Sequence, residues 1–291
     1  MNRELSARAY AKVNFGLRVL QKRDDGFHGI ESIFQTVDLF DELTVTVTVS
    51  DVNGCTVRCD SMELPEKNTL TMAYSAFCEV AGTEVPPVSV LLKKGIPSGG
   101  GLGGGSSDAA ALVRVLEKFC GIRLSYEQLD YVASKTGSDV FFFMHCDEEG
   151  HGCALVSGRG ENVRDIKPVE NLFLVMVFPE VSSSTKEAYA LVDEAFTRGD
   201  VLISPEFDEL ELIYRRPPEK WTFINTFTPV ISAKYEQIGR AIEALRNLGC
   251  DYAEMSGSGS TVFGVFTSRQ EAESAVQELT GSWNCKLART V

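Results

Sequence analysis

Residues 97–111 read PSGGGLGGGSSDAAA, and this stretch decides how the chain is interpreted. Six of the 25 glycines of the chain lie within the seven positions 99–105. Glycine loses more conformational freedom on folding than any other residue, so this concentration needs a reason. An apolar strand-like run, Val88–Lys93, precedes the glycines, and a helix-forming run, Ser106–Phe119, follows them. The stretch therefore predicts a strand–loop–helix unit.

Four interpretations of this glycine-rich loop can be compared with its sequence context. A flexible linker does not connect a strand directly to a helix. A P-loop requires a lysine after its last glycine, and none stands here. The pattern G-x-G-x-x-G of dinucleotide-binding folds is present at residues 99–104, but a segment this rich in glycine matches it almost by chance. An anion cradle made of backbone N–H groups remains, with a turn needed only for tight packing as the alternative.

The amino-acid composition and net charge of the chain exclude some classes of binding partner. The 291-residue chain has 44% hydrophobic and 24% charged residues, which is typical of a globular protein, and its formal net charge is −13. This charge argues against a nucleic-acid partner and against an anionic membrane surface. We find no signal peptide and no apolar run of membrane-spanning length, and eight cysteines without an export signal favour a reducing, cytoplasmic location.

The rest of the chain mixes strands and helices. A β signal over 38–58, with a turn at Asn53-Gly54, predicts a hairpin. Asn68 and the Ser125/Gln128 pair predict helix caps, and Gly137 predicts a helix end. Further on, strands are expected at 172–177, 252–267 (with a turn) and 285–289, helices at 185–196, 234–248 and 269–280, and the least ordered stretch at 197–218. The pattern predicts an α+β protein with two lobes, residues 1–160 and 161–291.

A histidine and cysteine cluster invites a metal-site interpretation. His145, Cys146, His151 and Cys153 are all residue types that bind zinc. Their spacing matches no known zinc motif, and the adjacent His145 and Cys146 cannot easily bind one ion together. We therefore expect no metal site there.

With the loop in view, the sequence resembles the GHMP kinases, whose second motif is P-x-x-x-G-L-G-S/G-S/G. Residues 9–43, AYAKVNFGLRVLQKRDDGFHGIESIFQTVDLFDEL, resemble the first motif of the members that act on 4-diphosphocytidyl-2-C-methyl-D-erythritol. Residues 135–143, KTGSDVFFF, resemble the segment with the catalytic aspartate, and residues 255–266, MSGSGSTVFGVF, resemble the third motif. The matches stand in family order from about residue 9 to residue 266, and together they are specific.

The resemblance implies a fold and an activity. The fold would be a two-lobed GHMP-kinase fold, with an N-terminal lobe like the βαβ fold of ribosomal protein S5 and a ferredoxin-like C-terminal lobe. The activity would be ATP- and Mg²⁺-dependent phosphorylation of the 2-hydroxyl of a cytidine diphosphate-linked methylerythritol, in the non-mevalonate route to isoprenoids, by a monomer or homodimer. One alternative is that the chain phosphorylates the substrate of another GHMP kinase. The other is that it is catalytically inactive and only binds nucleotide or a metabolite.

The resemblance also implies roles for individual residues. Asp139 matches the base and Lys12 the lysine that stabilises charge on the attacking oxygen. Phe27, where many members have tyrosine, and Tyr189 would enclose the cytosine, and His28 would read its edge. The remaining substrate positions are Asn14, Asn68, Thr185 and Asn225. The positions matching the ATP site are Lys94, Pro97, Ser98, Gly99, Gly100, Gly101, Leu102, Gly103, Gly104, Gly105, Ser106, Ser107 and Asp108, the last standing where some relatives have asparagine.

Overall fold

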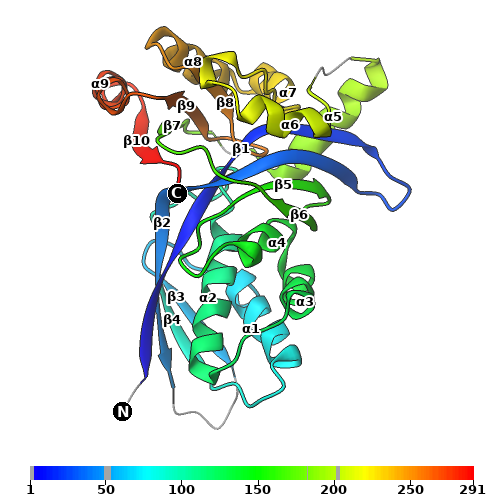
Figure 1. The fold of residues 1–291 in the computed structure, drawn as a ribbon, viewed down its shortest axis with the longest axis vertical. Helices are drawn as coiled ribbons and strands as arrows, with labels where there is room; N and C mark the ends of the chain where they lie inside the picture. The colour runs from blue at the N-terminus through cyan, green and yellow to red at the C-terminus, as the bar shows by residue number, and fades with distance from the viewer. Residues whose placement is uncertain (1–2, 49–53, 182, 201–203) are drawn as a thin grey trace. The chain divides into compact units, whose positions relative to one another are not determined.

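The computed structural model describes residues 3–48, 54–181, 183–200 and 204–291. Its contacts divide the chain into two compact units. The first unit comprises residues 1–11, 39–98 and 103–152, and the second comprises residues 12–38, 99–102 and 153–291. Two long strands, β1 (Glu4–Lys22) and β2 (His28–Val47), contribute residues to both (Figure 1). The lobe boundary predicted after residue 160 stays a prediction.

The strands of the first unit correct one prediction. Strand β4 (Val88–Lys93) lies between two partners: it pairs antiparallel with residues 42–47 of β2 and parallel with β3 (Cys55–Cys59). The predicted hairpin over 38–58 is therefore wrong, because β2 and β3 are not neighbours; residue 53 of its expected turn lies outside the described residues. Parallel strands need a crossover, and α1 (Thr69–Val80) supplies it, which gives the expected βαβ unit.

Four helices lie in the described residues of the first unit. They are α1, α2 (Gly104–Cys120), α3 (Tyr126–Thr136) and α4 (Ser138–His145). The predicted caps are confirmed, since Asn68 and Ser125 each form a capping box with the third residue of their helix. Helix α1 packs against α2 and α3, and α4 packs against the same two helices. The buried face of α2 includes the run Asp108–Val113, which holds this helix in the core.

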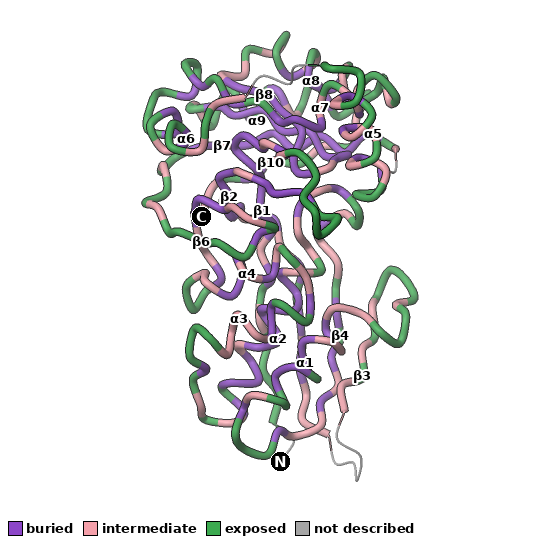
Figure 2. Tube along the Cα trace, turned by 90° about the vertical axis from the view of Figure 1, so that its right-hand side faces the viewer, coloured by how far each residue is buried: buried purple, intermediate pink, exposed green. Residues whose placement is uncertain are grey.

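The second unit contains a four-stranded antiparallel sheet in the order β10-β7-β9-β8. The strands are β7 (Phe173–Phe178), β8 (Tyr252–Met255), β9 (Val262–Phe266) and β10 (Asn284–Arg289), and the main helices are α5 (Thr185–Arg198), α7 (Phe227–Lys234), α8 (Glu236–Asn247) and α9 (Arg269–Leu279). This order agrees with the expected ferredoxin-like lobe. Strands β7 and β9 are almost entirely buried (Figure 2). A hairpin, β5 (Cys153–Gly158) and β6 (Asn162–Asp165), pairs with residues 30–35 of β2.

The stretch 197–218, expected to be poorly ordered, contains helix α6 (Phe207–Tyr214), followed by a short 3₁₀ turn, Pro218–Lys220. The prediction missed α6 because its order comes from a long-range contact. The buried Tyr214 hydroxyl donates to Gln35 Oε1 (2.9 Å) and accepts from the Val169 N–H (2.9 Å). The helix expected at 234–248 is confirmed as α8, whereas α7, which ends at Lys234 just before it, was not predicted.

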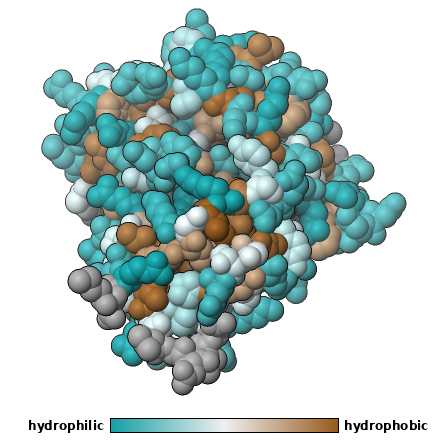
Figure 3. All heavy atoms as spheres, turned by 60° about the horizontal axis from the view of Figure 1, so that its bottom comes forward, coloured by the Kyte–Doolittle hydropathy of each residue, from teal (hydrophilic) through white to brown (hydrophobic). Residues whose placement is uncertain are grey.

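The molecular surface is mixed in character. Figure 3 shows one face, on which hydrophobic residues lie in small groups among hydrophilic ones. Scattered apolar groups of this kind are normal on globular proteins. Every helix in the described ranges is too short or too polar to cross a lipid bilayer.

The anchoring of α6 gives a testable prediction. Replacing Tyr214 with phenylalanine leaves the Val169 N–H and the Gln35 side chain without this partner in a buried position, so Tyr214→Phe should lower the free energy of unfolding by about 1–3 kcal/mol. Urea unfolding measures the change. Leu212→Ala on the same helix is the control, since Leu212 is 65% exposed and its loss should change stability by under about 0.5 kcal/mol. Equal effects of the two substitutions would contradict this account.

Candidate active site

In the second unit, the glycine loop packs directly on the turn of the third motif. A side chain on Gly101 would overlap the Ser256 carbonyl group, whose carbon would lie 2.9 Å from the added Cβ. The Ser256 hydroxyl donates to the Gly101 carbonyl (3.0 Å), and the Thr261 N–H donates to the Gly100 carbonyl (3.2 Å). The φ angle of Gly101 is +75°, a conformation that side chains disfavour. Two glycine-rich motifs thus meet backbone to backbone.

The loop itself presents main-chain N–H groups. Gly99, Gly101 and Gly103 have φ angles of +70°, +75° and +70°. Alternating left-handed residues turn successive N–H groups toward one side, which suits an anion. Helix α2 begins at Gly104, and among the described residues no side chain caps it at Gly103. The N–H groups of its first turn and the positive end of the helix dipole are therefore suited to an anion, as the sequence predicted.

In the first unit, Lys94 lies in a buried charge cluster. Its Nζ contacts the Asp41 carboxylate and lies 3.2 Å from Asp108 Oδ2. Asp41 Oδ1 accepts the N–H groups of Gly95 (2.6 Å) and Ile96 (2.8 Å), which lead into the loop. Asp41 was not predicted, although an aspartate inside a strand pattern is unusual enough to have been a signal. The cluster fixes the entry to the loop through charge-assisted hydrogen bonds.

Asp108 is the unusual acid of this cluster. Burial raises the pKa of its carboxyl group to about 8, and the nearby Lys94 lowers it only in part. Its Oδ1 atom has no hydrogen-bond partner among the described residues. Burial alone would lower the pKa of Lys94. The attraction of Asp108 and Asp41 is larger than this effect, so the pKa of the lysine is raised. Asp108 therefore holds its proton to higher pH than an ordinary aspartate, while Lys94 keeps its charge beside the buried Asp41.

Strand β1 carries Lys12 and Asn14 next to the loop within the second unit. The Lys12 N–H donates to the Leu102 carbonyl (2.9 Å). Its side chain is 3% exposed, its Nζ donates to Asn14 Oδ1 (2.7 Å) and lies 4.5 Å from the centre of the Phe34 ring. Asn14 in turn donates to Ser32 Oγ (3.0 Å). Because residues two apart on a strand share a face, β1 places both predicted side chains on one side.

Predicted substrate residues His28 and Tyr189 lie together. Their rings stack at a centroid distance of 5.0 Å and an angle of 24°. His28 Nδ1 lies 2.8 Å from the Leu20 carbonyl, so this nitrogen carries the hydrogen. Nε2 lies 3.1 Å from Asp193 Oδ1 without hydrogen-bonding geometry.

Phe27, predicted to face Tyr189 across the base, has a different neighbour. Its side chain is half exposed, and the Arg159 guanidinium carbon lies 3.7 Å from its ring centre. Arg159 stands in the hairpin between β5 and β6, and no sequence motif indicated it as a site residue. A guanidinium over an aromatic face is a favourable cation–π contact, which holds the two side chains together.

Asn225 and Thr185 hold the turn of the third motif. The buried Asn225 Nδ2 donates to the carbonyls of Met255 and Gly257, each at 2.8 Å. Thr185 Oγ1 lies 3.1 Å from Ser258 Oγ. Both predicted residues therefore position the turn that supports the glycine loop.

Two predicted residues lie in the first unit on helix N-termini. Asp139 is half-buried in the first turn of α4. Asn68 caps α1, since its Oδ1 accepts the N–H groups of Leu70 (3.0 Å) and Thr71 (3.1 Å). The start of α1 is close to the loop, because a Cβ on Gly105 would lie 3.3 Å from Thr69 Oγ1.

The remaining loop residues and the histidines are placed as follows. Ser106 is half-buried and Ser107 is buried in the first turn of α2, and Ser98 lies next to Met62. His145 lies 3.0 Å from Asp130 Oδ1, and His151 packs edge-on against Tyr10. Within the described ranges, no group of three or more histidine, cysteine, aspartate or glutamate residues could hold a metal ion.

Comparison with known proteins gives a consistent result. Residues 68–147 match the GHMP kinases N terminal domain, and residues 210–285 match the GHMP kinases C terminal family. The 4-diphosphocytidyl-2-C-methyl-D-erythritol kinase of Nitratidesulfovibrio vulgaris (strain DP4) is 37% identical over 97% of this chain and 96% of that protein. The enzyme of the same name from Treponema pallidum (strain Nichols) is 36% identical over 96% of both chains.

Solved structures agree with these relatives. A crystal structure of 4-(cytidine 5'-diphospho)-2C-methyl-D-erythritol kinase has a TM-score of 0.76 and 27% identity over 98% of this chain and 99% of that one. A homoserine kinase from Cytophaga hutchinsonii has a TM-score of 0.69 at 20% identity, covering 99% and 95% of the two chains, which shows a shared fold. The expected two-lobed α+β fold is confirmed.

The pKa of Asp108 predicts how stability changes with pH. Its folded value, about 8, lies above its ordinary value of 3.8, so the folded protein holds a proton that the unfolded chain releases. The contribution of Asp108 to the free energy of unfolding is therefore fully present below pH 3.8, and it is lost as the pH rises to about 8. Asp108→Asn imitates the protonated acid, so the Tm of the wild type should fall relative to that of the variant between about pH 4 and pH 8. Parallel Tm curves in a pH series would contradict this assignment.

Two glycines of the loop form a matched pair. Gly99 and Gly101 have almost the same positive φ, but a Cβ on Gly99 would meet nothing within 4 Å, whereas one on Gly101 would overlap Ser256. Alanine at either position must adopt a positive φ angle, which costs about 1 kcal/mol. Only in Gly101→Ala does the added Cβ also overlap Ser256. Gly101→Ala should therefore lower the free energy of unfolding by at least about 2 kcal/mol more than Gly99→Ala in urea titrations. Equal losses would show that the two turns do not touch.

Proposed function

Because this chain belongs to the 4-diphosphocytidyl-2-C-methyl-D-erythritol kinase family of the GHMP kinases, we propose that it phosphorylates the 2-hydroxyl of that cytidine diphosphate-linked polyol. The reaction would be a step of the non-mevalonate route to isoprenoids. The observation that carries the proposal is 37% identity over 97% of the chain to a relative of that name. GHMP kinase membership implies ATP as the phosphate donor. The packing of Gly101 on Ser256 supports the proposal, since it holds the glycine loop in one conformation.

The loop would bind the triphosphate through its backbone. The N–H groups of residues 99–107 and the start of α2 offer several donors to anionic oxygens, and the Ser106 hydroxyl adds one more. Lys94 would act indirectly, because two carboxylates already surround its ammonium group. Its role, with Asp41 and Asp108, would be to hold the loop entry. Pro97, Ser98 and Leu102 would shape the loop.

Asp139 and Lys12 would carry out the transfer. Asp139 would take the proton from the 2-hydroxyl as the hydroxyl oxygen bonds to the γ-phosphorus of ATP. The bond from that phosphorus to the bridging oxygen breaks, and ADP leaves with the electron pair. Lys12 would stabilise the negative charge that develops on the attacking oxygen. The hydrogen bond from Lys12 Nζ to Asn14 supports this role, because it fixes the direction of the buried ammonium group.

The cytosine would lie against aromatic side chains. The stacked His28 and Tyr189 and the half-exposed Phe27 with Arg159 provide flat surfaces, each worth about 1–3 kcal/mol per stacked base. With hydrogen on its Nδ1, His28 could accept the exocyclic amino group of cytosine at Nε2. Asn14, Asn68, Thr185 and Asn225 complete the proposed substrate set.

Mg²⁺ is a further part of the proposal. The donor set fits an ion held mainly by ATP, since the described side chains form no metal cluster of their own and the half-buried Ser106 hydroxyl lies at the start of α2. Bound there, the ion would neutralise charge on the phosphates. The lobes at 1–160 and 161–291, a monomeric or homodimeric state and a cytoplasmic location also stay proposals.

ADP release with different acceptors tests the proposed substrate. The protein with ATP and Mg²⁺ should release ADP when 4-diphosphocytidyl-2-C-methyl-D-erythritol is added, and not with mevalonate or homoserine. If mevalonate or homoserine is phosphorylated and the cytidine compound is not, the proposed substrate is wrong and the chain has another GHMP kinase activity. Binding of the cytidine compound without ADP release would instead identify a protein that only binds.

Asp139→Asn tests the proposed base. The variant should bind ATP normally but turn over about 10²–10⁴-fold more slowly, because an amide cannot take the proton. Asp208→Asn is a matched control, since Asp208 also lies in the first turn of a helix and loses the same favourable interaction with the helix dipole. Single-turnover kinetics measure both variants. Near-normal rates in Asp139→Asn would remove Asp139 from this role.

A further inference from the structure

Two pairs of side chains meet where strands β1 and β2 pair in the second unit. Lys12 and Asn14 are two residues apart on β1, so they share one face of that strand. Ser32 and Phe34 are related in the same way on β2. The Phe34 ring lies under the Lys12 ammonium group, Ser32 lies against Asn14, and all four side chains are buried. The proposed reaction assigns no task to Ser32, although it contacts the Lys12–Asn14 pair.

Hydrogen bonds connect the Lys12 ammonium group to the backbone through two side chains. Lys12 Nζ donates to Asn14 Oδ1 (2.7 Å), and Asn14 Nδ2 donates to Ser32 Oγ (3.0 Å). The Ser32 hydroxyl donates in turn to the Gly16 carbonyl (2.5 Å). The Ile33 carbonyl is a more distant acceptor for this hydroxyl, at 3.3 Å. Ser32 therefore stands between a backbone carbonyl and the amide that contacts the lysine.

The two ends of this chain of hydrogen bonds determine its direction. An ammonium group can only donate, so the Asn14 atom that faces Lys12 must be the amide oxygen. A carbonyl can only accept, so the single hydrogen of the Ser32 hydroxyl is directed toward Gly16. The Ser32 oxygen is then an acceptor, and the Asn14 atom that faces it must be the amide nitrogen. Ser32 thus selects the orientation of Asn14 that Lys12 requires.

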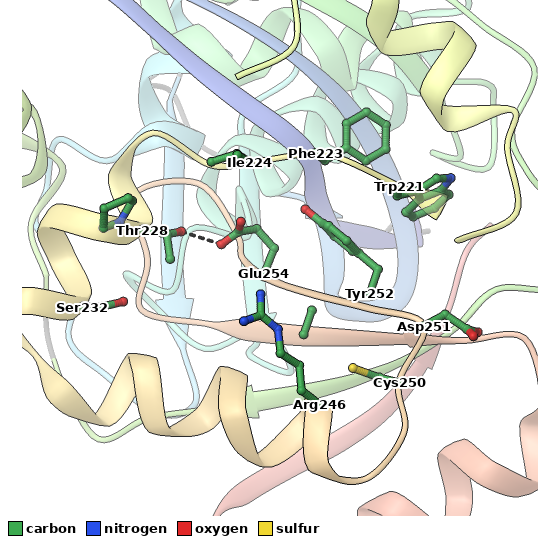
Figure 4. Close-up of a pocket in the computed structure, with 12 residues that line it drawn as sticks. Trp221, Phe223, Ile224, Thr228, Ser232, Arg246, Cys250, Asp251, Tyr252 and Glu254 are labelled. Carbon is green, nitrogen blue, oxygen red and sulfur yellow. Dashed lines mark hydrogen bonds between the residues drawn. The ribbon is translucent and has the colours of Figure 1, made fainter. Parts of the chain in front are cut away.

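The carbonyl at the end of the chain belongs to a fixed part of β1. Gly16 has a φ angle of +70°, and a Cβ at this position would lie 3.0 Å from Phe223 Cδ1. The Phe223 ring is itself held by Trp221 and Tyr252, at 5.3 and 6.1 Å between ring centroids (Figure 4). The close approach to this aromatic group limits the movement of the Gly16 backbone. The Ser32 hydroxyl therefore has an acceptor with a defined position.

We propose that Ser32 is a positioning residue for the phosphoryl transfer, and that it acts on Lys12 through the amide of Asn14. This inference rests on the proposed function, because it concerns the charge that Lys12 would stabilise. Without the Ser32 hydroxyl, the Asn14 amide nitrogen loses its acceptor in a buried position, and the amide no longer has a fixed direction. The ammonium group then moves from its place, and a displacement of about 1 Å can lower a rate about 100-fold.

Steady-state kinetics of Ser32→Ala test the inference. The kcat should fall about 10- to 100-fold, because a hydrogen bond that orients a charged group is lost. The KM for ATP should change less than about twofold, since the glycine loop is held by its own contact between Gly101 and Ser256. Ser32→Thr keeps the hydroxyl and should have a near-normal kcat. A normal kcat in Ser32→Ala, or equal losses in the alanine and threonine variants, would overturn the proposal.

Thr36→Val is the matched control. Thr36 also lies on β2, is buried, and donates its hydroxyl to a main-chain carbonyl, that of Val291 (2.8 Å). Loss of either hydroxyl should lower the Tm, because each removes a buried hydrogen bond. Only Ser32→Ala should lower kcat, since only Ser32 contacts Asn14. Equal losses of kcat in the two variants would show that Ser32 has a purely structural role.

A double-mutant cycle tests whether Ser32 acts through Asn14. Asn14→Ala should lower kcat by itself. Adding Ser32→Ala should then lower kcat less than about twofold further, because the residue through which Ser32 acts is absent. Two losses that multiply would contradict the proposed route.

The Asn14 side-chain amide gives a readout that does not depend on turnover. Its NMR signals are identified by their loss in Asn14→Ala. The Nδ2 hydrogens should exchange with solvent at least about tenfold faster in Ser32→Ala than in the wild type or Thr36→Val. If the wild type releases no ADP with the cytidine compound, the proposed function fails, and this exchange rate still decides whether Ser32 fixes Asn14. Equal exchange rates in the wild type and Ser32→Ala would overturn the role given to Ser32.

Discussion

The close contact between Gly101 and the Ser256 carbonyl group is the constraint on which the second unit's glycine loop depends. No side chain fits there, so the loop and the turn of the third motif determine each other's conformation. Further bonds fix the turn from behind: Asn225 holds the Met255 and Gly257 carbonyls, and Thr185 contacts Ser258. The concentration of glycine at residues 99–105 is thus explained by this packing, and it also leaves main-chain N–H groups that are suited to an anion.

The negative net charge of the chain explains why main-chain N–H groups are suited to bind the phosphates of the proposed nucleotide. The chain carries a formal net charge of −13, and the two lysines placed near the loop are already engaged. Lys94 lies against Asp41 and Asp108, and Lys12 donates to Asn14. Main-chain N–H groups and the dipole of α2 supply positive potential without a mobile side chain, and they need no rearrangement when phosphate arrives. In the proposed reaction, Lys94 would fix the entry to the loop, and Lys12 would stabilise the negative charge that develops during transfer.

Local signals predicted much of the fold, and long-range contacts account for the failures. The caps at Asn68 and Ser125 and the strand before the loop were correct because they depend on neighbouring residues. The hairpin over 38–58 was wrong because β4 separates its strands, and α6 was missed because Tyr214 anchors it to residues far away in sequence. At the site, family motifs predicted the side chains that the second unit brings together, but only the structure showed Asp41 and Arg159 as partners of Lys94 and Phe27.

The proposed role of residues 99–107 is to bind the triphosphate through their main-chain N–H groups. Amide hydrogen exchange, measured with and without a non-hydrolysable ATP analogue and Mg²⁺, tests it most directly. The account predicts that exchange slows at the N–H groups of this loop and of the first turn of α2, because the phosphate oxygens accept them. Slower exchange elsewhere in the protein, with exchange at the loop unchanged, would contradict the account.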